Sequence, residues 1–200
     1  KKNLKLGVVL LGKGTVFYDD ILAGVHDKAA ELNGYNCSVL IRQTEYDLRK
    51  QLHAIDGLLA EGINGLAISP YNDKAVREKI DELHSLGIPV VTLNTDIENS
   101  RRMAYVGSHF YRSGETAGGL MHLMTSGEVL VGIISGSQNV LCHTERIAGF
   151  RHVIKSYGGI QIVETINNSD DETQSYGLTA AMLHRHPEIN ALYFTAGGVY

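Results

Sequence analysis

The most constraining feature of this sequence is an internal repeat, in which matching glycines stand at positions 7 and 132, 125 residues apart. The matched segments follow one strand–helix–strand order, and they are residues 6–10 with 131–135, 21–25 with 146–150 and, one residue further out of step, 63–68 with 189–194. This repeat predicts two halves built on one plan. Two similar α/β lobes have a natural cleft between them, and we expect the functional site there.

Short apolar runs bounded by Gly, Pro or Asn predict the strands of the fold. These runs cover residues 6–11, 37–41, 66–69, 90–93, 104–106, 129–135, 160–166 and 191–195. Most of them are apolar throughout rather than alternating, which is typical of parallel strands that are covered on both faces. Apolar residues at helical spacing predict helices over residues 21–32, 48–59, 76–86, 147–157 and 178–182.

The predicted order is β-α-β-α-β-α-β, then the short strand at 104–106 and a link, and then β-α-β-α-β. Alternation of this kind predicts an α/β fold of two similar lobes, each a doubly wound parallel sheet with right-handed crossovers. We place the boundary near Gly107, which gives an N-terminal lobe of residues 1–107 and a C-terminal lobe of residues 108–200. The last predicted strand is not followed by the helix and strand found at the matching point of the first lobe. We therefore expect the second lobe to be partial in this chain.

Composition and charge exclude several classes of protein. The chain has 200 residues, of which 44% are hydrophobic and 20% charged, as in an ordinary globular protein. A net charge of −4 argues against nucleic-acid binding by this segment, because phosphate contacts need basic side chains. No apolar run approaches the roughly 20 residues that span a bilayer, and residues 1–3 do not resemble a signal peptide. Cys37 and Cys142 fall in different halves without CxxC spacing, so we favour reduced thiols of a cytosolic protein over a disulfide between the lobes.

Candidate ligand-binding residues follow the predicted strands, because ligands of open α/β sheets bind beyond the carboxyl ends of the strands. They are aromatic, amide, carboxylate, imidazole and guanidinium side chains, namely Phe17, Tyr18, Asn94, Asp96, His143, Arg146 and Asp171. A sugar requires such groups, since its C–H faces stack on aromatic rings and its hydroxyls bond to Asn, Asp and Arg. The site therefore favours a sugar or a sugar-like molecule that contacts both lobes.

The candidates of the first lobe each have a structural alternative. Phe17 and Tyr18 could fix the first helix to its sheet, and adjacent helical residues cannot both face inward, so one of the two is expected to meet the ligand. Asn94 and Asp96 could only shape a turn, which is the usual role of these residue types after a strand.

The candidates of the second lobe are weighed in the same way. Ser169 with Glu172 matches a capping box, which would make Asp171 a charge at a helix N-terminus rather than a ligand group. His143 could lie on the surface. Arg146 falls early in a helix, where a cation opposes the helix macrodipole, and this unfavourable position favours a functional role.

Signatures of catalysis and of metal or cofactor binding are weak. Residues 12–14 read Gly-Lys-Gly and do not form GxGxxG, and the sequence contains no GxxxxGK[ST] and no GxSxG. No HExxH or Cys/His cluster has metal-ligand spacing. No residue pair stands out as a nucleophile with its base. We therefore expect a protein that is not an enzyme and that uses no metal and no cofactor.

The whole chain resembles the periplasmic-binding-protein type I fold, as found in LacI-family transcriptional regulators and in ribose-type sugar-binding proteins. The resemblance rests on the Phe17-Tyr18 pair followed by residues 21–25, on the Gly-Ile-Pro-Val-Val run at 87–91, and on Thr-Glu-Arg-Ile-Ala-Gly-Phe at 144–150, which is similar to the family's R-x-x-G-F motif. It implies two lobes that close on a ligand.

The resemblance also implies roles for individual residues. Phe17 and Tyr18 match the aromatic pair that flanks a bound sugar, Asn94 matches a polar contact after the fourth strand, and Arg146 matches an arginine that clamps the ligand from the second lobe. Two positions depart from the family pattern: Thr-Val at 15–16 replaces Asn-Pro, and Ala-Gly at 196–197 replaces Asn-Asp. The second change removes an expected hydroxyl-binding pair, which argues against a standard pentose or hexose.

Two functions follow from the resemblance. Residues 94–96 with 100–107 look more like the regulators, so our first hypothesis is the cytoplasmic effector-binding core of a LacI-type regulator. Such a core would form a homodimer and bind operator DNA through an N-terminal helix-turn-helix that this chain lacks, with a sugar-like effector changing the lobe angle. The alternative is a monomeric, exported solute-binding protein of a sugar ABC transporter. An enzyme on the same fold is the least favoured interpretation.

Overall fold

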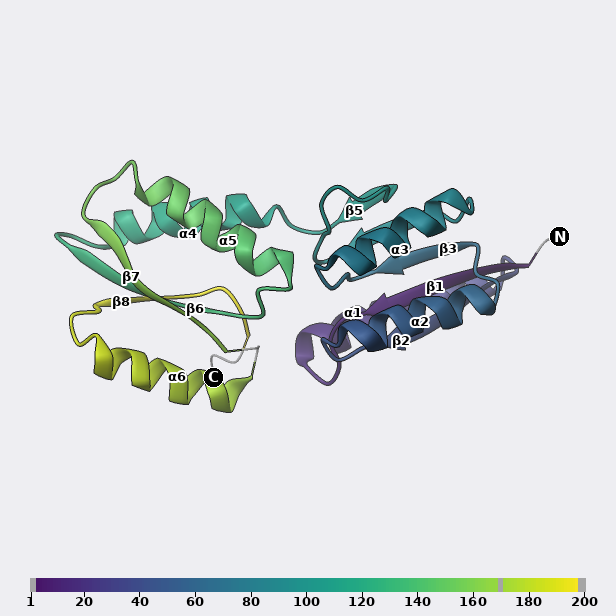
Figure 1. The fold of residues 1–200 in the computed structure, drawn as a ribbon, viewed down its shortest axis with the longest axis horizontal. Helices are drawn as coiled ribbons and strands as arrows, with labels where there is room; N and C mark the ends of the chain where they lie inside the picture. Colours follow the sequence, from purple (N-terminus) through teal and green to yellow (C-terminus); the bar gives the residue numbers. More distant parts are fainter. Residues whose placement is uncertain (1–2, 169–170, 198–200) are drawn as a thin grey trace. The chain divides into compact units, whose positions relative to one another are not determined.

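The computed structural model describes residues 3–168 and 171–197 and divides into two compact units, Lys1–Gly107 and Ser108–Tyr200 (Figure 1). Each unit is a parallel sheet with helices packed on its faces, so the predicted α/β fold class is confirmed. The predicted strands are all present, with bounds shifted by no more than two residues.

Unit 1 holds a five-stranded parallel sheet in the order β2-β1-β3-β4-β5. Its strands are β1 (Leu4–Leu10), β2 (Cys37–Gln43), β3 (Gly65–Ile68), β4 (Val90–Leu93) and β5 (Ala104–Val106), and its helices are α1 (Val16–Asn33), α2 (Leu48–Ala60) and α3 (Lys74–Ser85). Alternate residues of β1 point to opposite faces of the sheet. Val9 packs into the main core with α2 and α3, whereas Leu6 and Val8 face α1.

Unit 2 holds a three-stranded parallel sheet in the order β7-β6-β8. Its strands are β6 (Val129–Ser135), β7 (Ile160–Asn167) and β8 (Ala191–Phe194), and its helices are α4 (Phe110–Met124), α5 (Leu141–Ile154) and α6 (Glu172–Arg185). Helices α4 and α5 pack side by side on one face, and α6 lies on the other (Figure 1). The core between the sheet and α4–α5 includes Val131, Ile133 and Phe150, all fully buried.

The internal repeat corresponds to a shared core geometry in the two units. The strand that starts each copy has a neighbour on both sides, with β2 and β3 beside β1, and β7 and β8 beside β6. A Cβ on Gly7 would lie 3.2 Å from the Leu66 side chain, and a Cβ on Gly132 would lie 3.0 Å from that of Leu192. Both glycines therefore leave room for a leucine of the neighbouring strand.

Helix α4 is the element that the sequence analysis missed, because residues 110–124 were interpreted as a link. Three glycines in this helix, at 114, 118 and 119, lower its intrinsic helix propensity. Two of them are required by packing: a Cβ on Gly114 would lie 2.0 Å from the Arg146 carbonyl oxygen, and one on Gly118 would lie 2.4 Å from Val153. From the other side, a Cβ on Gly149 would lie 1.8 Å from the Tyr111 carbonyl oxygen. The glycines that weaken the helix signal of α4 in the sequence also allow its backbone to contact the backbone of α5.

We predict that Gly149→Ala destabilises the protein by about 3 kcal/mol, because the added methyl group would force the two helix backbones apart. Gly119→Ala on α4 is the matched control: its Cβ would meet only the Tyr157 hydroxyl, at 3.5 Å, and it should raise stability by about 0.5–1 kcal/mol. Urea unfolding followed by circular dichroism measures both. Equal stability of Gly149→Ala and the parent protein would contradict the close helix contact.

Candidate ligand-binding site

The aromatic pair of unit 1 divides into one buried and one exposed ring. Tyr18 is 3% exposed and its ring fills the space where a Cβ on Gly12 would stand, whereas Phe17 is 53% exposed. The two rings meet edge to face with centroids 5.2 Å apart, and Tyr46 packs against Tyr18 in the same geometry at 6.1 Å. Tyr18 therefore anchors the start of α1, and Phe17 presents the aromatic surface at the carboxyl edge of the sheet.

Asn94 lies in the turn that follows β4, with a left-handed backbone at φ 63°. Its backbone N–H donates to the Val106 carbonyl, and its own carbonyl accepts from the Tyr105 hydroxyl at 2.9 Å. The side-chain amide forms no hydrogen bond within the part of the chain that the structure describes. The turn interpretation thus accounts for the backbone of Asn94, while its side chain remains available to a ligand.

Asp96 is held by its own unit. One carboxylate oxygen accepts from the Thr92 hydroxyl at 2.7 Å, and the other lies 2.5 Å from Nη2 of Arg102. The two charged side chains are only 14% and 27% exposed, so the pair is largely shielded from water. This arrangement makes Asp96 an anchor of the segment between β4 and β5, which agrees with the structural alternative for this residue.

Arg146 of unit 2 lies at a site made by three groups that come from different parts of the chain. Its Cζ stands 4.4 Å from the ring centroid of Phe110, the first residue of α4. Its Nη1 donates to the Thr195 carbonyl at 2.9 Å and approaches the Cys142 Sγ at 3.9 Å. Nε and Nη2 form no hydrogen bond with any residue that the structure describes, so three N–H donors are available to a ligand.

His143 shares the same acceptor. It is 6% exposed, and its Nδ1 lies 3.0 Å from the Thr195 carbonyl oxygen. Because a carbonyl cannot donate, Nδ1 must carry the proton in this contact. One carbonyl oxygen thus accepts from both His143 and Arg146, using its two lone pairs, and ties the start of α5 to the end of β8.

Further buried polar groups at this edge of unit 2 were missed by sequence reasoning. The Thr195 hydroxyl donates to the Ser135 hydroxyl at 3.1 Å, and the amide of Asn168 donates to the Gly197 carbonyl at 3.0 Å. Thr195, Ser135 and Asn168 are each 5% exposed or less. Their position directly at the ends of β8, β6 and β7 was the available signal, since polar residues that close apolar strands mark the carboxyl edge.

Tyr193 lies on β8, two residues before Thr195. Its ring stacks on that of Phe150, with the ring centroids 4.7 Å apart. Burial raises the pKa of the Tyr193 phenol, and the positive charge of Arg146 partly opposes this rise. Tyr193 therefore stays a neutral phenol at physiological pH, and Arg146 is the cation that acts on this part of the core.

Asp171 is the N-cap of α6. Its carboxylate accepts from the Gln174 backbone N–H at 2.7 Å, and its own N–H donates to the Asn168 carbonyl. The helix-terminus interpretation of Asp171 therefore describes its position, although the predicted capping box placed the cap at Ser169, which lies outside the described residues.

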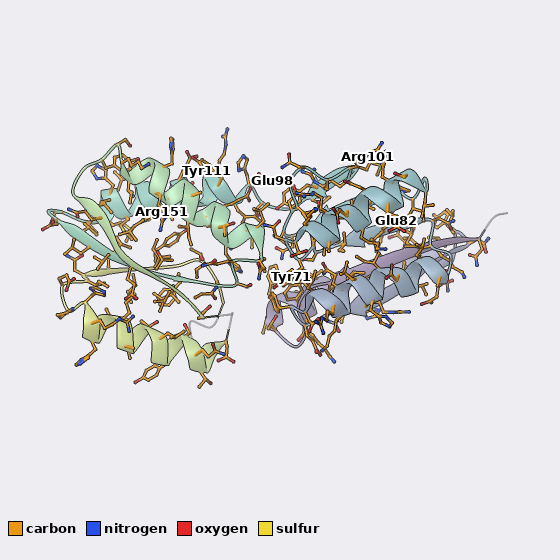
Figure 2. The ribbon with its side chains drawn as sticks, in the orientation of Figure 1. Tyr71, Glu82, Glu98, Arg101, Tyr111 and Arg151 are labelled. Carbon is orange, nitrogen blue, oxygen red and sulfur yellow. The ribbon has the colours of Figure 1, made fainter. Side chains whose placement is uncertain are left out.

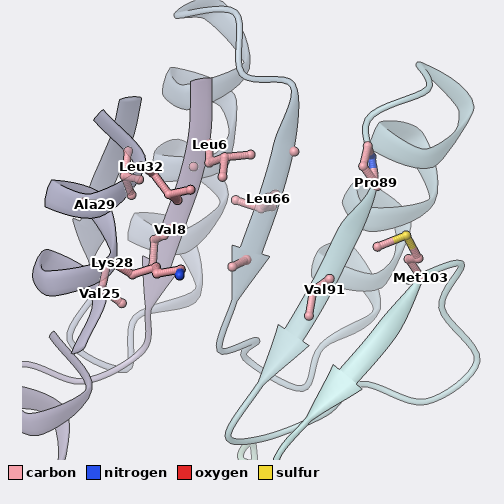
Figure 3. Close-up of a pocket in the computed structure, with 14 residues that line it drawn as sticks. Leu6, Val8, Val25, Lys28, Ala29, Leu32, Leu66, Pro89, Val91 and Met103 are labelled. Carbon is pink, nitrogen blue, oxygen red and sulfur yellow. The ribbon is translucent and has the colours of Figure 1, made fainter. Parts of the chain in front are cut away.

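An apolar groove of about 330 Å³ lies in unit 1 between α1 and the sheet (Figure 3). It is lined by hydrocarbon from β1, β3 and β4 and by Val25, Ala29 and Leu32 of α1, with Lys28 as its one charged residue. Such a lining cannot satisfy sugar hydroxyls. In unit 2, α4 occupies the corresponding place beside α5, so the groove reflects how few elements cover this face of the unit 1 sheet.

The described residues contain neither a metal-binding cluster nor a membrane-spanning helix. Within residues 3–168 and 171–197, no three His, Cys, Asp or Glu side chains gather as a metal site would require. Among the helices described, none is long and apolar enough to cross a membrane. Cys37 and Cys142 are both buried, in different units.

Comparison with known proteins identifies the family. The two parallel-sheet units define an α/β binding-protein architecture, and the family model described as a periplasmic binding protein domain matches residues 6–200. The chain belongs to this family.

Three relatives illustrate the similarity. The ribose import binding protein RbsB of Bacillus subtilis is 23% identical over 193 residues, which cover 96% of this chain and 62% of that protein. The ABC transporter solute-binding protein of Burkholderia graminis, solved in complex with D-arabinose, is 25% identical with a TM-score of 0.89 over 98% of this chain and 67% of that one. GanP, a glucose-galactose binding protein of Geobacillus stearothermophilus, is 26% identical with a TM-score of 0.87 over 97% and 69%. The chain thus spans less than two thirds of the length of RbsB.

We predict that Asp96→Asn lowers stability by about 1–3 kcal/mol, because the shielded Arg102 loses its anionic partner. Glu98→Gln makes the same change of charge two residues away, at an exposed position labelled in Figure 2, and should alter stability by no more than about 0.5 kcal/mol. Thermal unfolding in parallel samples measures the difference. If both variants have the same melting temperature as the parent protein, Asp96 is not a structural anchor.

Proposed function

We propose that this chain is the sugar-binding part of an import binding protein that serves an ABC transporter. The observation that carries the proposal is its membership of the periplasmic binding protein domain family, together with relatives whose names describe binding of ribose, arabinose, glucose and galactose. These names describe binding rather than a catalysed reaction, which is consistent with the expectation that the protein is not an enzyme.

The chemistry of the candidate residues supports a polyhydroxylated ligand. Phe17 offers an exposed ring face for the C–H groups of a sugar, and the Asn94 amide offers a donor and an acceptor for hydroxyls. In unit 2 the Nε and Nη2 donors of Arg146 can bind two adjacent hydroxyl oxygens, since a guanidinium presents its N–H groups in a fixed planar fork. That both units contribute to one site stays a prediction.

The regulator hypothesis receives less support than its alternative. The relatives reported above are import or solute-binding proteins, and nothing among them supports an operator DNA, a homodimer or a cytoplasmic location. The segments at 94–96 and 100–107 that favoured a regulator have structural roles here: Asp96 pairs with Arg102, and Tyr105 bonds the turn at Asn94. We therefore give the transport function precedence.

We predict that Arg146→Ala weakens sugar binding at least tenfold, because charge-assisted hydrogen bonds from the guanidinium are lost. Isothermal titration of the full-length protein with ribose, arabinose, xylose, glucose, galactose and glycerol identifies the ligand and gives its Kd. Arg151→Ala is the control, since Arg151 is exposed in the last turn of the same helix (Figure 2) and should leave the Kd within twofold. An unchanged Kd in Arg146→Ala would remove this residue from the site, and no binding of any sugar would refute the proposed function.

Sedimentation velocity separates the transport and regulator functions. We expect the full-length protein to sediment as a monomer with and without the sugar identified by titration, as an import binding protein should. A tight dimer would contradict the transport proposal and return the regulator hypothesis to first place.

A further inference from the structure

The guanidinium of Arg146 is oriented by the protein before any ligand binds. The Thr195 carbonyl holds one terminal nitrogen at 2.9 Å, but a single hydrogen bond still allows the planar group to rotate about that contact. The ring of Phe110 supplies the second constraint, because it lies under the carbon of the guanidinium at 4.4 Å. One edge contact and one face contact together define both the position and the plane of the group.

Phe110 is itself held firmly. It is 5% exposed and stands at the first residue of α4, where His109 caps the helix by accepting from the Arg112 backbone N–H. One turn further along α4, Gly114 lies directly against the backbone of Arg146, so close that a Cβ would lie 2.0 Å from the Arg146 carbonyl. The backbone contact and the ring contact therefore join the same two helices at Arg146, and the ring has little freedom to move away.

We propose that Phe110 is a positioning residue for ligand binding, which acts through Arg146 by holding its guanidinium plane in the orientation that engages sugar hydroxyls. This inference rests on the proposed function, since it assumes that Arg146 binds the sugar. The ring attracts the cation through its π face, and partial burial strengthens this attraction. The Nε and Nη2 donors, which form no hydrogen bond with any residue that the structure describes, are thereby held in one plane.

The test compares Phe110→Leu, Phe110→Tyr and Phe150→Leu in the full-length protein, with the Kd measured by titration with the sugar that binds the parent. Phe110→Leu removes the π face and should weaken binding about three- to thirtyfold. Phe110→Tyr keeps the π face and should stay within about twofold of the parent Kd. Phe150→Leu is the matched control: Phe150 is a fully buried ring of the same unit that stacks on Tyr193, and its loss should lower the melting temperature with little change in Kd.

Two results would overturn the proposal: a Kd of Phe110→Leu no weaker than that of Phe150→Leu, or equal losses for Phe110→Leu and Phe110→Tyr. A second readout does not depend on sugar binding. The ¹⁵N relaxation order parameter of the Arg146 Nε–H group in the ligand-free protein should fall in Phe110→Leu and stay unchanged in Phe150→Leu. If the parent binds no sugar, the proposed function fails on its own. The relaxation comparison then decides whether Phe110 positions Arg146, and an unchanged order parameter in Phe110→Leu would refute it.

Discussion

The contact between α4 and α5 is the constraint on which the rest of unit 2 depends. Gly114 and Gly149 leave no room for a Cβ between the two backbones, so the helices meet backbone to backbone at these two positions. This approach covers the sheet with Phe150 and Ile154 and, at the other end of α4, brings Phe110 under the guanidinium of Arg146. The core and the candidate site of this unit are therefore consequences of the same pair of glycines.

The repeated halves differ in what covers their sheets. The first strands of the two copies, β1 and β6, match in their two neighbours and in a glycine that accommodates a leucine of an adjacent strand. The first helices of the repeat do not match in their surroundings, since a Cβ on Gly24 of α1 would meet nothing within 4 Å, whereas Gly149 of α5 packs on α4. The groove beside α1 follows from this difference, and its lining is almost entirely apolar (Figure 3).

Periodicity predicted the strands and most helices because each buries a regular apolar face. Such a face is visible as apolar spacing within a short stretch of sequence. It failed at α4, where packing depends on glycines that local propensity counts against a helix. The candidate site was predicted as far as single residues at strand ends, including Phe17, Asn94 and Arg146. The partners of Arg146 were not predictable in this way, since Phe110 precedes it by 36 residues and the Thr195 carbonyl follows it by 49.

The burial of Arg146 also explains why those partners are needed. Arg146 lies in the second turn of α5, beyond the first turn where the macrodipole acts most strongly on a charge. Its partly buried guanidinium requires electron-rich groups in place of the water that it loses. The Thr195 carbonyl and the Phe110 ring face provide them, and His143 Nδ1 donates to the same carbonyl. The rotational freedom of Arg146 is thus lost on folding rather than on binding. For the proposed sugar ligand, a group ordered in advance lowers the entropic cost of forming the complex.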